Sequence, residues 1–60
     1  METNRRKIVA RLQREGWEGK AGGMHDIFRH KLKPGRIVIP RHGDLSTGVA
    51  REIAKIAGWA

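Results

Sequence analysis

The first apolar pattern in the chain is a stripe at helical spacing near the N-terminus. It comprises Ile8, Val9 and Leu12. Thr3 or Asn4 precedes the stripe as a candidate N-cap, and Gly16 follows it where a left-handed residue commonly ends a helix. The pattern predicts a helix of about three turns.

A second stripe at helical spacing lies near the C-terminus. Its apolar residues are Val49, Ile53 and Ile56, with Ala50 and Ala57 beside them. Ser46 or Thr47 can cap the start of this helix, and Gly58 can end it.

Between the two helices, short β-prone runs alternate with turn residues. The expected strands are Trp17 to Lys20, His25 to Leu32 and Arg36 to Ile39. Ala21 to Gly23 turn the chain between the first two strands, and Lys33 to Arg36 fit a type II turn with Pro34 and Gly35 at its centre. Pro40 cannot donate to a ladder and is expected to end the last strand.

The order helix, strand, strand, strand, helix indicates an α+β fold. We expect a three-stranded antiparallel sheet with two helices on one face and the other face open. A chain of 60 residues has room for one thin core, so residues 1–60 are expected to form a single domain.

The net charge of the chain indicates which classes of partner it binds. Thirteen Lys and Arg stand against six Asp and Glu, which gives a net charge of +7 and favours a polyanion such as nucleic acid, or an acidic protein. The chain lacks cysteine and has no stretch typical of a signal peptide or membrane span. We therefore expect a cytoplasmic protein with no membrane contact.

His25 is the candidate catalytic residue. Period-2 alternation places it on one face of its strand with Ile27, Arg29 and Lys31, and places Phe28 and Leu32 on the other. If Phe28 and Leu32 face the helices, His25 shares the open face with cations. In the alternative, Ile27 faces inward and His25 is an ordinary residue at the core edge.

RNA cleavage needs few protein groups because the 2′-hydroxyl of the substrate is the nucleophile. A histidine can move the proton near neutral pH, and Arg or Lys can stabilise charge on the phosphate. Metal hydrolysis is not expected, because His25 and His30 point to opposite faces of a strand. A nucleophilic triad is also not expected, since Ser46 and Thr47 stand where a helix cap is needed. The prediction includes no metal and no cofactor.

Other residues have both a binding and a structural interpretation. The residues expected to contact RNA are Lys20, Gly22, Gly23, Arg29, Lys31 and Arg36. The glycine pair allows close approach of a phosphate, although it can equally be a simple turn. Trp17 and Trp59 can stack on bases, but packing in the core or at a helix end is the favoured interpretation.

Four segments resemble the HicA-type toxins, which are small mRNA interferases of toxin–antitoxin systems. Gly23 to Phe28 is similar to the family motif Gly-Ser-His-His-x-Phe, and Leu12 to Trp17 is similar to the end of the family's first helix. Val38 to Gly43 resembles Val-Val-Pro-x-His-Gly, and Gly48 to Ile53 resembles Gly-Thr-Leu-Arg-x-Ile, followed by Ala57 and Gly58 at the family's Ala-Gly. Met24 replaces the family's serine, and Asp26 replaces its second histidine.

The resemblance implies a double-stranded-RNA-binding-domain-like fold, ribosome-independent cleavage of mRNA, translation arrest and neutralisation by a HicB-type antitoxin. It places the family's catalytic histidine on His25 and a recurrent histidine on His42, which we interpret as structural. Two alternatives remain: a non-catalytic RNA-binding module, and an interaction protein whose basic surface docks an acidic antitoxin or another protein. The sequence leaves the oligomeric state, the cleavage specificity and the strandedness of the RNA open.

Overall fold

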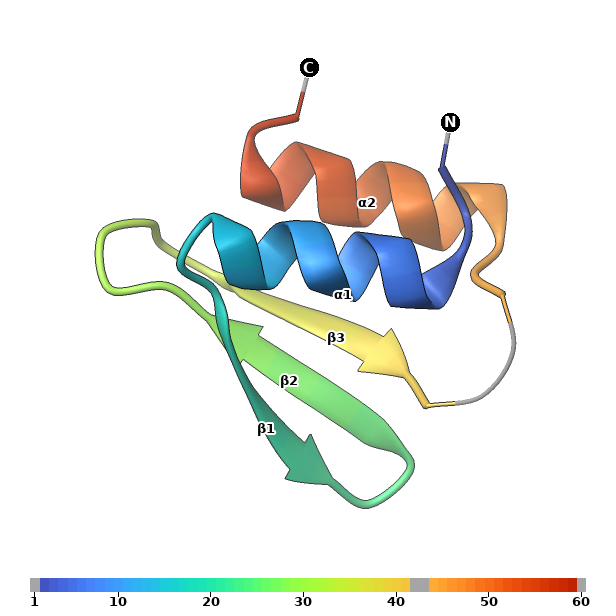
Figure 1. The fold of residues 1–60 in the computed structure, drawn as a ribbon, viewed down its shortest axis with the longest axis horizontal. Helices are drawn as coiled ribbons and strands as arrows, with labels where there is room; N and C mark the ends of the chain where they lie inside the picture. The colour runs from blue at the N-terminus through green and yellow to red at the C-terminus, as the bar shows by residue number, and fades with distance from the viewer. Residues whose placement is uncertain (1, 42–43, 60) are drawn as a thin grey trace.

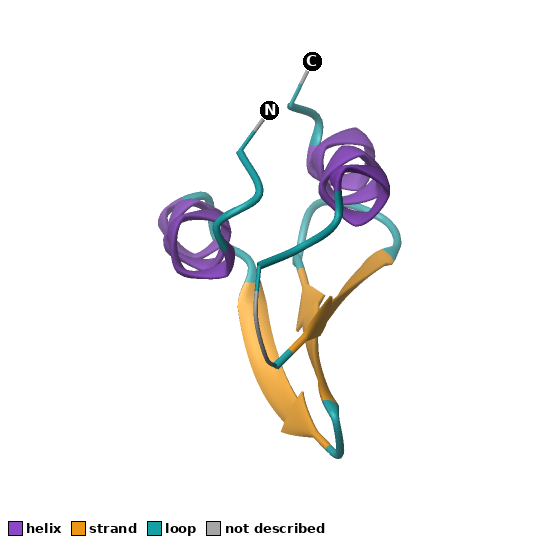
Figure 2. Ribbon diagram, turned by 90° about the vertical axis from the view of Figure 1, so that its right-hand side faces the viewer, coloured by secondary structure: helices purple, strands orange, loops and turns teal. Residues whose placement is uncertain are grey.

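The computed structural model describes residues 2–41 and 44–59 and has the predicted order of elements (Figure 1). The elements are α1 (Arg5–Arg14), β1 (Glu18–Gly22), β2 (His25–Arg29), β3 (Arg36–Pro40) and α2 (Thr47–Ala57). The strands form one antiparallel sheet in the order β1-β2-β3. Both helices lie on the same side of this sheet and run in the same direction (Figures 1 and 2). The predicted α+β fold is therefore confirmed.

Each helix is capped as its sequence indicates. The side chain of Asn4 accepts from the backbone N–H of Lys7, and that of Ser46 accepts from Val49. These bonds satisfy N–H groups that have no partner within the helix. Gly16 and Gly58 follow the helices with φ of 97° and 81°, a conformation that favours glycine.

The core lies between the helices and the inner face of the sheet. Its buried members are Ile8, Leu12, Trp17, Phe28, Ile37, Ile39, Leu45, Ala50, Ile53 and Ala57. In α2 the buried side is centred on alanines and Ile53, while Val49 and Ile56 are only partly buried. Small alanine side chains let α2 approach its neighbours closely, which suits a thin core.

Strand limits differ from the prediction. β1 continues to Gly22, so the turn consists of Gly23 and Met24, and β3 includes Pro40. Gly35 has φ of 86°, as expected for the second central residue of a type II turn. β2 ends at Arg29 rather than Leu32.

The early end of β2 has a local cause. The ring of His30 bonds through Nε2 to the carbonyl of Glu15 at 2.9 Å, and its Nδ1 accepts from the N–H of Leu32 at 3.0 Å. Such side-chain bonds compete with a strand ladder. Of the two residues that face the helices in the favoured arrangement, only Phe28 is buried; Leu32 is 88% exposed, so that arrangement is wrong for Leu32.

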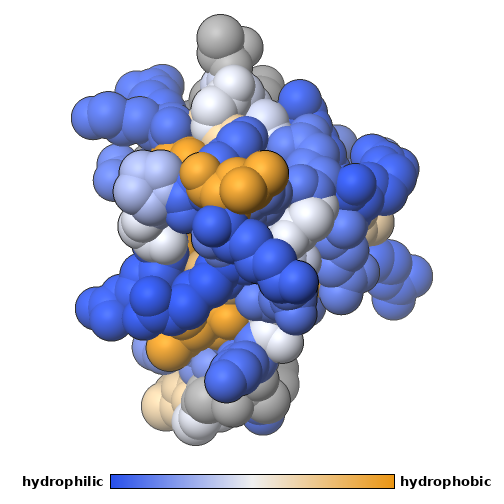
Figure 3. Space-filling model, turned by 90° about the vertical axis from the view of Figure 1, so that its left-hand side faces the viewer, coloured by the Kyte–Doolittle hydropathy of each residue, from blue (hydrophilic) through white to orange (hydrophobic). Residues whose placement is uncertain are grey.

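Hydrophilic side chains dominate the surface on the left of Figure 1. Figure 3 shows this side, where apolar atoms form small patches separated by polar ones. None of the helices within residues 2–41 and 44–59 is long and apolar enough to cross a membrane.

Candidate functional site

His25 is the first residue of β2 and follows directly on a tight turn. It pairs with Gly22 of β1 and with Pro40 of β3, so Gly23 and Met24 alone connect the two strands. Gly23 has φ of 29°, and Met24 is 78% exposed. The imidazole of His25 therefore stands at the end of a hairpin where solvent and a ligand have access.

The face on which His25 lies is decided by Phe28. Phe28 is 3% exposed and belongs to the core. Because side chains alternate along a strand, His25, Ile27 and Arg29 lie on the opposite, open face. His25 is exposed. The alternative with His25 at the core edge is therefore wrong, and the expected exposure of His25 is confirmed.

The open face is arranged in three rows across the strands. The first row holds Gly22, His25 and Pro40; the second holds Lys20, Ile27 and Val38; the third holds Glu18, Arg29 and Arg36. Lys20, Arg29 and Arg36 are exposed, as required for contact with a polyanion. At the rise of a β-strand, the third row lies about 13 Å from the first.

Lys31 lies near the open face, but not as a residue of β2, which is how the prediction placed it there. It lies beyond the end of β2, so alternation along the strand does not place it. It nevertheless lines a shallow hollow of about 480 Å³ together with Lys20, Ile27 and Arg29. The structure thus brings three of the predicted cations to one hollow, with Arg36 beside Arg29 on the next strand.

Asp26 points away from the open face. Its carboxylate is on the helix side of the sheet, where it pairs with Arg5 of α1 and with Arg41 after β3. The acidic residue that follows His25 is thus neutralised on the other side of the strand. No pattern in the sequence predicts these pairs, since the partners are 21 and 15 residues away.

The remaining candidates have structural roles or lie outside the described residues. Trp17 is 2% exposed and packs edge-on against the ring of His30, with 5.3 Å between the ring centroids. His42 falls outside the described residues. No three His, Cys, Asp or Glu side chains gather as a metal-ligand group within residues 2–41 and 44–59.

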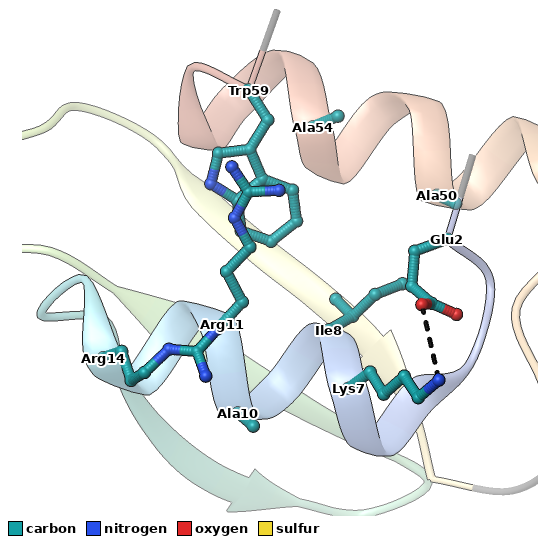
Figure 4. A pocket seen from close by; sticks show the side chains of 9 residues that line it. All are labelled: Glu2, Lys7, Ile8, Ala10, Arg11, Arg14, Ala50, Ala54 and Trp59. Atoms are coloured by element: carbon teal, nitrogen blue, oxygen red, sulfur yellow. Dashed lines mark ion pairs between the residues drawn. The ribbon is translucent and has the colours of Figure 1, made fainter.

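A second depression, a groove of about 560 Å³, lies between the two helices (Figure 4). At one end the guanidinium of Arg11 lies 4.1 Å from the ring centroid of Trp59. The indole N–H of Trp59 donates to the carboxylate of Glu15 at 2.7 Å. This bond, together with the nearby charge of Arg11, lowers the pKa of Glu15 below its ordinary value.

The lowered pKa predicts a local transition in acid. A group whose pKa is depressed in the folded state stabilises that state at higher pH, and the contribution is lost as the pH falls through the depressed pKa. We expect the indole N–H resonance of Trp59 to shift during acidification of the folded protein, and to stay constant in Glu15→Gln. The indole of Trp17, which is buried and has no hydrogen-bond partner among residues 2–41 and 44–59, is an internal control. Equal shifts of both indoles in both proteins would contradict this assignment.

A comparison with models of known protein families identifies the family of this chain. The family model described as HicA toxin of bacterial toxin–antitoxin matches residues 5–59. No curated protein matched the chain. The match runs from the first residue of α1 to Trp59 and so includes the sheet and both helices. The chain therefore belongs to the HicA toxin family, and its role is that of the toxin in a bacterial toxin–antitoxin system with a cognate antitoxin as partner.

Proposed function

We propose that this toxin is a metal-independent RNA endonuclease, an mRNA interferase that arrests translation. The observation that carries the proposal is the exposed imidazole of His25 on the open face of the sheet, the face that also carries Lys20, Arg29 and Arg36. A net charge of +7 draws RNA to the molecule, and the cations hold its phosphates. Activity on mRNA would take place in the cytoplasm.

The reaction uses the ribose of the substrate as nucleophile. His25 in its neutral form takes the proton of the 2′-hydroxyl, the 2′-oxygen forms a bond to phosphorus, and the bond from phosphorus to the 5′-oxygen breaks. The departing 5′-oxygen receives a proton from the imidazolium or from water. The products are a 2′,3′-cyclic phosphate and a 5′-hydroxyl end. Lys20, in the row next to His25, contributes by stabilising negative charge on the reacting phosphate, whereas Arg29, two rows away, holds a phosphate farther along the RNA.

The glycine turn gives the RNA backbone room. Gly22 and Gly23 carry no side chain next to His25, and a Cβ built at Gly23 would meet no atom of the described residues within 4 Å apart from its chain neighbours. A phosphate can therefore approach the turn closely. Lys31 and Arg36 extend the positive surface toward the far end of the sheet.

The direct test is incubation of the purified protein with single-stranded RNA in EDTA, followed by analysis of the new ends. We expect cleavage with a cyclic phosphate at one end and a 5′-hydroxyl at the other. A 3′-hydroxyl with a 5′-phosphate would indicate water as the nucleophile and overturn the mechanism. RNA binding without product at any pH would favour a non-catalytic module, and negligible binding at physiological salt would favour a surface that serves only to dock a protein.

The antitoxin in this proposal is a HicB-type protein that covers the face carrying His25. Occlusion would prevent RNA from reaching the imidazole without any change in the toxin's fold. A complex that leaves this face open and yet is inactive would contradict simple occlusion.

A further inference from the structure

The carboxylate of Asp26, the residue after His25, bonds to two guanidinium groups. Its Oδ2 accepts from Nη2 of Arg5 at 2.5 Å, and its Oδ1 accepts from Nε of Arg41 at 3.1 Å. The side chains of Asp26 and Arg5 are only 22% and 24% exposed. Both carboxylate oxygens are thus used by guanidinium groups from two different parts of the chain.

The same two arginines also bond the backbone around His25. The Nε of Arg5 donates to the carbonyl of Pro40 at 2.7 Å, and Pro40 is the residue that pairs with His25 in the sheet. The backbone N–H of Arg41 donates to the carbonyl of Met24 at 3.3 Å. We call Asp26, Arg5 and Arg41 the carboxylate clamp. It joins the start of α1, the end of β3 and the turn before His25.

The location of the clamp matters because the turn itself is weakly held. Gly23 and the exposed Met24 contribute no buried side chain, so little apart from backbone pairing orders the residue that follows. The positive charge at the start of α1 is a second reason why the clamp matters. Arg5 stands in the first turn of α1, where the helix dipole disfavours a cation, and Asp26 compensates it. Without the carboxylate, two guanidinium groups would face each other at the start of β2.

We propose that Asp26 is a positioning residue, which holds His25 in place for the reaction through Arg5 and Arg41 and does not itself contact the RNA. The inference rests on the proposed function, because it assigns Asp26 a part in catalysis by His25. Alternation along β2 keeps the carboxylate on the helix side of the sheet while His25 faces the substrate. Displacement of a reacting group by about 1 Å can reduce a rate by about 100-fold.

The test compares Asp26→Asn with the wild type in RNA cleavage. Asparagine keeps the size of the side chain but loses the charge, and its amide group would face one of the two guanidinium groups. We expect kcat to fall by about 10- to 100-fold. KM and the midpoints of the pH profile are expected to stay the same, because the group that moves the proton is still His25. Glu52→Gln in α2, which removes one exposed carboxylate far from the clamp in sequence, is the matched control and should cleave as the wild type does.

A second variant tests the clamp more gently. Arg5→Lys keeps the charge, but an ammonium group lacks the planar fork that reaches both Asp26 and the carbonyl of Pro40. We expect a smaller loss of kcat than in Asp26→Asn, in a protein that remains folded by circular dichroism. Should Asp26→Asn fail to fold, this variant decides the question, and unchanged kcat in it would overturn the proposal.

Hydrogen exchange of the backbone amides in residues 23–25 gives a readout that does not require RNA cleavage. We expect faster exchange in Asp26→Asn than in the wild type or Glu52→Gln. If the wild-type protein does not cut RNA, the proposed function fails, and exchange alone then judges the clamp. Unchanged exchange, cleavage at the wild-type rate by Asp26→Asn, or a displaced pH profile would each overturn the positioning role.

Discussion

Replacement of His25 by alanine is expected to reduce RNA cleavage by about 100- to 10,000-fold, the range that proton transfer by a positioned side chain contributes. The ring is exposed on the open face and makes no contribution to the core, so the variant should stay folded. His25→Gln is expected to lose as much activity, because an amide can form hydrogen bonds but cannot shuttle a proton near neutral pH. In cells, growth arrest on expression of the toxin should disappear with either change.

The measurement is the rate of RNA cleavage in EDTA, with folding checked by circular dichroism. His30→Gln is the matched control, since it removes the same side chain from a position whose ring bonds to Glu15 and packs on Trp17. In this control we expect a larger change in the free energy of unfolding than in the rate of RNA cleavage by the folded protein. Equal cleavage by the wild type and His25→Ala would show that another group moves the proton.

Replacement of Phe28 by alanine is expected to unfold much of the protein. Removal of a phenylalanine from a core costs about 3–5 kcal/mol. Small domains bury a modest part of their surface, and their total stability starts at about 5 kcal/mol. Phe28 is 3% exposed and lies in the middle strand of the sheet. It belongs to the hydrophobic core that both helices and the sheet share. Thermal and urea denaturation followed by circular dichroism would measure the loss.

The contact between Phe28 and Gly19 offers a sharper form of this test. A Cβ added at Gly19 would lie 2.6 Å from Cε2 of the Phe28 ring, which is too close for two carbon atoms. Gly19→Ala should therefore destabilise the wild type, because the ring must move. In a Phe28→Leu background the same change should cost less, with a coupling energy of about 0.5–3 kcal/mol. Additive effects of the two substitutions would contradict the packing described for this pair.

Much of the architecture follows from the sequence through local rules. Asn4 and Ser46 precede apolar stripes of helical spacing, and Gly16 and Gly58 follow them in the left-handed conformation. These signals act between residues that are near one another in the chain, so they can be read without a structure. The alternation of side chains along β2 likewise puts His25 and Phe28 on opposite faces of the sheet. The face of His25 therefore follows once Phe28 is taken to face the helices.

The tertiary structure decided what depends on residues distant in the chain. β2 ends at Arg29 because the ring of His30 bonds to Glu15, which is 15 residues earlier. Gly19 is required because the ring of Phe28 from the paired strand occupies the space of a side chain. Asp26 faces away from the open face and is held by Arg5 and Arg41, and no periodicity joins these three residues. Contacts of this kind depend on which surfaces meet after folding, so local propensity fixed the elements of this toxin, whereas packing fixed their ends and the surroundings of its candidate catalytic histidine.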